Sequence, residues 1–101
     1  MTKISKFNDF INKSHENRTE NERLTLKTMK IWEEVWEFYN EVLGSLWFTR
    51  AGKQHSREEL ENECADVILS TLLVASDLWI KIDEVLEKKL NKVFDRFNLN
   101  D

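Results

Sequence analysis

Residues 31–38 read Ile-Trp-Glu-Glu-Val-Trp-Glu-Phe, and they carry three carboxylates and two tryptophans within about two helical turns. Glu34 and Glu37 are three residues apart, so they project from the same face of a helix, and Glu33 flanks them. No basic residue lies within the stretch. Taken alone, such a cluster is typical of a solvated helix face, because Glu is a good helix former.

The sequence around this stretch predicts a long amphipathic helix, since its apolar positions recur every three or four residues. Thr19 and Glu22 have the spacing of a capping box at its start. Gly44 is expected to end it, and a loop at 45–55 should follow. The expected core stripe consists of Leu24, Thr28, Ile31, Val35, Phe38 and Val42.

A third helix is predicted from a second capping box at Ser56 and Glu59 to about Trp79. Its expected core stripe consists of Leu60, Cys64, Val67, Thr71, Val74 and Leu78. Residues 67–78 are apolar nearly all round, and a helix of that kind in so short a chain needs cover from another subunit. The chain is therefore expected to form a homodimer or a homotetramer.

Shorter helices are predicted at both ends of the chain, at about 4–16 and at 82–97. The first should bury Ile4, Phe7, Phe10 and Ile11. The last should bury Val85, Leu86, Leu90, Val93, Phe94 and Phe97. The predicted fold is all-α, with four helices, a central antiparallel pair, and one domain over residues 1–101.

Composition narrows the class of protein. A chain of 101 residues without proline and with only two glycines suits a single helical domain. The net charge of −4 argues against a general nucleic-acid or membrane binder. Cys64 has no partner for an internal disulfide, which indicates a reducing compartment. The sequence shows no signal-peptide or membrane-span pattern, and a cytoplasmic protein is expected.

A second acidic pair changes the interpretation of the first. Glu63 and Asp66 repeat the spacing of three, and both pairs lie one residue before the core stripe of their helix. In an antiparallel pair of helices, flanks with equal offset fall on the same side. Counting residues from the loop, Glu37 should lie level with Glu63, and Glu34 with Asp66. Four carboxylates facing one another would repel unless a hard divalent cation, Mg²⁺ or Mn²⁺, compensates them.

The order of these motifs, EExxE at 33–37 followed by ExxD at 63–66, resembles that of the MazG-like all-α nucleoside triphosphate pyrophosphohydrolases. The resemblance covers about residues 24–97, including the basic last helix. It implies Mg²⁺-dependent hydrolysis of a (deoxy)nucleoside triphosphate between the α and β phosphates, which yields a monophosphate and pyrophosphate. It also suggests a house-cleaning role toward damaged or surplus nucleotides.

The resemblance also implies residue roles. Glu34, Glu37, Glu63 and Asp66 match the metal ligands of that family. Glu33 matches the acid that orients or deprotonates the attacking water. The positions that match substrate-binding ones are Lys30, Lys89 and Arg96, and Trp47 in the expected loop is a candidate for stacking on the base. Trp36, Ser70 and Val93 depart from the residues usual in the family.

Two other functions remain open from the sequence. One is phosphoribosyl-ATP pyrophosphohydrolysis, which uses a related scaffold. The other is a non-catalytic helical oligomeric module that binds metal, nucleotide or a partner helix. An assay for pyrophosphate release from nucleotides distinguishes the two enzyme hypotheses from the non-catalytic module.

Overall fold

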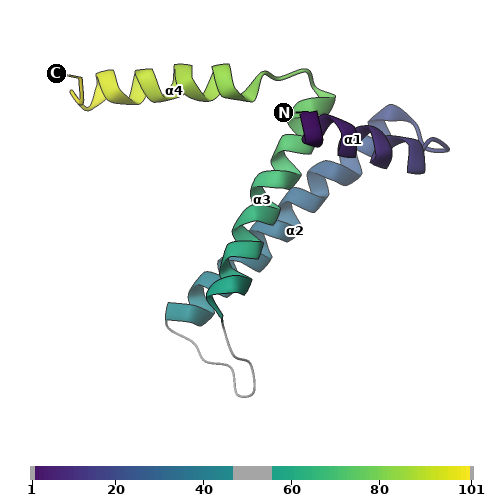
Figure 1. The fold of residues 1–101 in the computed structure, drawn as a ribbon, viewed down its shortest axis with the longest axis horizontal. Helices are drawn as coiled ribbons and strands as arrows, with labels where there is room; N and C mark the ends of the chain where they lie inside the picture. Colours follow the sequence, from purple (N-terminus) through teal and green to yellow (C-terminus); the bar gives the residue numbers. More distant parts are fainter. Residues whose placement is uncertain (1, 47–55, 101) are drawn as a thin grey trace.

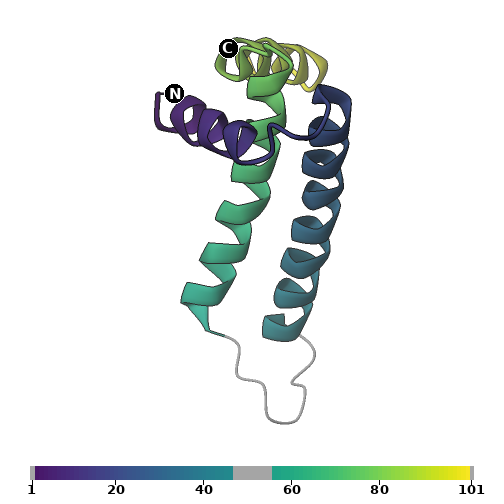
Figure 2. The same cartoon turned by 90° about the vertical axis from the view of Figure 1, so that its right-hand side faces the viewer.

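The computed structural model describes residues 2–46 and 56–100. It contains α1 (Thr2–Ser14), α2 (Glu20–Leu46), α3 (Arg57–Asp77) and α4 (Ile82–Arg96), with no strand among the described residues. Helices α2 and α3 lie side by side and antiparallel, and α1 lies across the end of the pair where α2 begins and α3 ends (Figures 1 and 2). The predicted all-α fold with a central antiparallel pair is therefore confirmed.

The starts of the two central helices follow the predicted capping boxes. The Glu22 amide donates to Thr19 Oγ1 at 3.1 Å, and the Thr19 amide donates back to Glu22 Oε1 at 3.0 Å. The Glu59 amide donates to Ser56 Oγ at 3.1 Å. These bonds satisfy amides that have no partner within the helix, so the sequence places both starts correctly.

The predicted ends are less accurate. Gly44 does not end α2, because it stays helical and is buried, and the helix continues to Leu46. Glycine ends a helix only where the chain turns left-handed, and elsewhere tertiary packing can keep it helical. Helix α3 ends at Asp77, slightly before the predicted Trp79. Trp79 itself takes the left-handed conformation (φ 57°), and the Ile80 amide then donates to the Ala75 carbonyl at 2.9 Å.

The buried face of α2 is rotated relative to the predicted stripe. Thr28 and Val35 were expected in the core and are exposed, whereas Glu34 and Glu41 are buried. On α3, Thr71 is exposed, as is Leu78 just after the end of the helix, while the other four residues of the predicted stripe are partly buried. The buried and half-buried residues of α2 are Arg23, Leu24, Lys27, Ile31, Glu34, Phe38, Glu41, Val42, Leu43 and Gly44. Glu34 and Glu41 thus lie within the α2–α3 interface, whereas Glu37 stays exposed.

A hydrogen-bonded network fixes α1 on the central pair. The Lys27 ammonium donates to Asp77 Oδ2 at 2.6 Å, to Asn8 Oδ1 at 2.7 Å and to Asn12 Oδ1 at 2.6 Å. The Asn8 and Asn12 amides donate to Asp77 Oδ1 at 2.7 and 3.1 Å. All three protons of the ammonium therefore have acceptors, which a largely buried cation requires.

This network explains why only part of the predicted apolar face of α1 is buried, since Ile4 and Ile11 are half-buried and the two rings are not. Asn8 is only 3% exposed, while Phe7 and Phe10, which the spacing placed in the core, are 42% and 64% exposed. Turning the helix to bury the two rings would remove the acceptors of Lys27. The polar partners of one lysine thus decide the orientation of α1.

Helix α4 leaves the other three helices and projects sideways from the end of α3 (Figure 1). Its apolar residues were expected to face inward, but within one chain most of them are exposed. The radius of gyration of 17.2 Å exceeds the roughly 13 Å of a compact domain of this length. Among the described residues, Ala75, at 6% exposed, is the one buried hydrophobic side chain. A single chain therefore leaves most of its apolar surface in water.

We expect Asp77→Asn to lower the free energy of unfolding by about 2–4 kcal/mol at neutral pH, because Lys27 would keep a largely buried charge without its counter-ion. Denaturant unfolding measures this change. Asp9→Asn, on the exposed side of α1, is the matched control and should leave stability unchanged.

The same substitution should change how the free energy of unfolding depends on pH in acid. Burial alone would raise the pKa of Asp77, but the hydrogen bonds from Lys27, Asn8 and Asn12 outweigh it and lower the pKa. A carboxylate with a lowered pKa stabilises the fold above its unfolded pKa of about 3.9 and loses that contribution as the pH falls through the folded value. The difference between wild type and Asp77→Asn should therefore shrink below about pH 4. A difference that stays constant to about pH 2 would contradict this account.

Candidate metal centre

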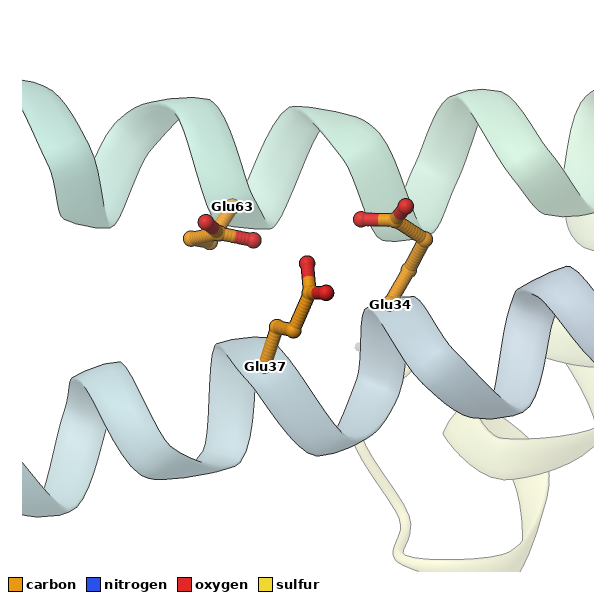
Figure 3. A group of neighbouring side chains, drawn as sticks. All are labelled: Glu34, Glu37 and Glu63. Atoms are coloured by element: carbon orange, nitrogen blue, oxygen red, sulfur yellow. The ribbon is translucent and has the colours of Figure 1, made fainter.

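Three carboxylates from the two central helices meet halfway along the pair. Glu34 and Glu37 extend from α2 toward α3, and Glu63 comes from α3 (Figure 3). One oxygen of each side chain lies within 4.8 Å of the others. The antiparallel pairing brings Glu37 and Glu63 together as expected, although α2 continues past Gly44 and the two residues are not equally far from the ends of their helices.

The burial of these side chains leaves oxygens without partners. Glu34 is only 6% exposed and Glu63 is half-buried, whereas Glu37 is exposed. Glu34 Oε2 and Glu63 Oε2 are both buried and have no hydrogen-bond partner among the described residues. Buried carboxylate oxygens without partners are costly and need a compensating cation or donor.

The electrostatics of the group point the same way. Burial raises the pKa of Glu63, and the negative charges of Glu37, Asp66, Glu34 and Glu41 raise it further. A divalent cation would relieve both the desolvation and the repulsion. A site of carboxylate oxygens with no nitrogen or sulfur suits a hard cation. The residues present therefore fit a divalent metal ion.

Asp66 does not join this group of three. It lies on α3 three residues after Glu63 and is exposed, although its charge is close enough to raise the pKa of Glu63. Glu34 instead groups with Glu37 and Glu63, and its carboxylate is buried between the two helices.

Glu41 is a further carboxylate near the group, and it was not among the residues predicted for the site. It lies one turn after Glu37, is 5% exposed, and contributes to the raised pKa of Glu63. Glu34 and Glu41 are seven residues apart, a spacing that could have indicated a shared inner face. The predicted core stripe instead used the next residue at each position, Val35 and Val42.

Lys30 and Glu33 lie at one end of the carboxylate group. Lys30 Nζ is 3.0 Å from Glu34 Oε1 and 3.3 Å from Glu33 Oε2. The hydrogen bonds to Glu34 and Glu33 raise the pKa of Lys30. Glu33 is beside the cluster but not part of it, and its side chain is 63% exposed. Lys30 therefore brings a positive charge to the edge of the site.

The other expected substrate-binding residues are not brought to the cluster within one chain. Lys89 and Arg96 are exposed on α4, which has no extended packing against α2 or α3. Figure 1 shows α4 pointing away from the central pair. Trp47 lies outside the described residues.

Comparison with protein families identifies residues 22–98 as a match to the MazG nucleotide pyrophosphohydrolase domain. The matched residues include α2, α3 and α4 and all of the clustered carboxylates, whereas α1 precedes them. Comparison with curated proteins and with solved structures gave no match. None of the helices that the structure describes is both long and apolar enough to cross a membrane.

Proposed function

Because the chain belongs to the MazG nucleotide pyrophosphohydrolase domain family, we propose that it hydrolyses a (deoxy)nucleoside triphosphate to the monophosphate and pyrophosphate in the presence of Mg²⁺. The observation that carries this proposal is the group of Glu34, Glu37 and Glu63, with two buried oxygens that have no partner among the described residues. Mn²⁺ suits the same oxygen ligands. A house-cleaning role toward damaged or surplus nucleotides goes with the proposal.

The proposed ligands of the metal are Glu34, Glu37, Glu63 and Asp66. When bound, a divalent cation supplies charge stabilisation for the phosphate oxygens and lowers the pKa of a bound water. The exposed carboxylate of Glu33, hydrogen-bonded by Lys30, is available to orient or deprotonate the attacking water.

The substrate is proposed to meet basic residues from two chains. Lys30 lies beside Glu34 and can contact a phosphate from within the same chain. Lys89 and Arg96 would contact phosphates if α4 of one subunit packs against the α2–α3 pair of another. Trp47 is proposed as a further substrate-binding residue. We further propose that residues 1–101 form one domain, since the Lys27 network joins α1 to the matched region.

The test is release of pyrophosphate from a panel of ribo- and deoxyribonucleoside triphosphates, with and without Mg²⁺. Metal-dependent formation of the monophosphate and pyrophosphate from at least one nucleotide is expected. Release of orthophosphate in place of pyrophosphate, or no hydrolysis of any nucleotide, would overturn the proposal and favour a non-catalytic binding module.

We expect the protein to be an obligate homodimer or homotetramer that buries on the order of 2,000 Å² or more in total. The support is the exposed apolar surface of a single chain, which includes Trp32 at 75%, Trp36 at 63% and the apolar side of α4. Ile68 and Leu78, within the apolar stretch at residues 67–78, are also exposed. Light scattering at micromolar concentration measures the mass, and a monomer there would contradict the prediction.

A further inference from the structure

A cavity of about 270 Å³ lies between α1, α2 and α3, and the proposed function does not use it. The aliphatic side chains of Ile11, Leu26 and Leu73 line it, one from each helix. His15 and Arg18, from the connection between α1 and α2, also line it. The cavity therefore combines an apolar floor with basic groups near its edge, which is the usual composition of a small-molecule site.

The cavity adjoins the candidate metal centre. Lys30 lines it and also forms the 3.0 Å ion pair with Glu34. On α3, Ser70 lines it and lies one turn after Asp66, to whose carbonyl its hydroxyl donates at 2.7 Å. A molecule held at the carboxylates by its phosphates can thus extend along the same side of the helix pair into the cavity.

The polar groups of the cavity wall are mainly N–H donors. Arg23 Nη1 occupies the carbonyls of His15 and Arg18, at 3.5 and 2.5 Å, so those two acceptors already have a donor. The ammonium of Lys27 is saturated by its own three acceptors, so it has no proton left for a ligand. No carboxylate lines the cavity among the described residues. Of the remaining polar side chains, Arg18, Arg23 and Lys30 can only donate. His15 and Ser70 can donate or accept, so the wall offers a ligand more donors than acceptors.

These features favour a base over a bare phosphate as the occupant. Three aliphatic side chains do not stabilise a bound phosphate. A flat ring, in contrast, buries apolar surface against them, which is favourable. A carbonyl on the edge of the ring would accept from the donors of the wall. An exocyclic amine at the same position would bring donor against donor and leave both without a partner.

Resting on the proposed function, we propose that this cavity receives the base of the nucleotide and selects bases with a carbonyl edge, such as uracil and hypoxanthine, over their amino counterparts, cytosine and adenine. Three of the lining residues, Ile11, His15 and Arg18, precede residue 22, where the family match begins. The selection is thus built partly from α1, which the Lys27 network holds in place.

The experiment compares kcat/KM for pyrophosphate release within two matched pairs, dUTP against dCTP and ITP against ATP. Each pair changes chiefly a carbonyl into an amine. We expect about a tenfold or larger preference for the carbonyl member of both pairs. Arg18→Gln should reduce that ratio by lowering the rate with the carbonyl member alone. Lys13→Gln, an exposed α1 cation that does not line the cavity, should keep the ratio.

Other outcomes overturn the inference. Hydrolysis of all four nucleotides at similar kcat/KM would refute the selection and leave the proposed function standing. Equal loss with both members of a pair in Arg18→Gln would show that the basic groups bind phosphate. If no nucleotide is hydrolysed, the proposed function fails, and calorimetric binding of dUMP against dCMP and of IMP against AMP decides the inference. Equal affinities, or no binding, would then overturn it too.

Discussion

Replacing Glu37 by glutamine should lower Mg²⁺-dependent pyrophosphate release about a hundredfold or more and leave the protein folded and oligomeric. Glu37 is exposed, so the change removes little packing, and glutamine keeps the length and helix propensity of the side chain. Its oxygen lies within 4.8 Å of oxygens of Glu34 and Glu63, so the charge of the ligand set falls by one. Steady-state rates, circular dichroism and light scattering together separate lost chemistry from lost structure.

The control for this variant has to come from the structure. Glu41→Gln, one turn further along α2, would be the obvious control from residue spacing alone. Glu41 is instead buried on the inner face of α2, and its charge acts on Glu63. Glu61→Gln is better matched, because Glu61 is two residues from Glu63, is 61% exposed, and pairs with Arg57 on its own helix. Equal losses in the Glu37 and Glu61 variants would mean that general negative charge is responsible. Wild-type activity of Glu37→Gln would refute the carboxylate site.

Local patterns were enough to predict the central pair and its contact point. The capping boxes at Thr19 and Ser56 depend on side chains three residues away, so the sequence displays them directly. The level of Glu37 with Glu63 was counted back from Gly44 and forward from Ser56. Gly44 does not end α2, but the count was close enough to bring the two residues into one group.

The buried faces could not be predicted in the same way, because they depend on partners far along the chain. Lys27 is separated by fifty residues from Asp77, and this pair places a lysine in the interior and turns α1 so that Asn8 is buried in place of Phe7. Periodicity also cannot tell surface buried within one chain from surface left for another. The apolar residues of α4 and the ring of Trp36 have core-like spacing and are exposed.

Mg²⁺ or Mn²⁺ should raise the melting temperature of the wild-type protein, because a ligand that binds only the folded state stabilises it by mass action. At a concentration one hundred times Kd the gain is about 2.7 kcal/mol, which is about 10 °C or more for a domain of this size. Scanning calorimetry with and without the cation measures the shift. Chelator-treated samples without added Mg²⁺ or Mn²⁺ give the baseline.

Glu63→Gln and Asp66→Asn should both abolish this shift, but they should differ without the cation. Burial and the neighbouring carboxylates raise the pKa of Glu63, so its charged form destabilises the metal-free fold once the pH exceeds the unfolded pKa. At neutral pH, Glu63→Gln should therefore raise the metal-free melting temperature. Asp66 is exposed, and its replacement should change that temperature little.

The two variants together decide the ligand set. A full metal shift in Asp66→Asn, combined with none in Glu63→Gln, would limit the ligands to the three glutamates that lie together in the structure. A full shift in Glu63→Gln would place the cation elsewhere, because the unpartnered Glu63 Oε2 is the atom that most needs it. Glu61→Gln, whose pairing stays within α3, should show the wild-type shift and so exclude a general effect of charge.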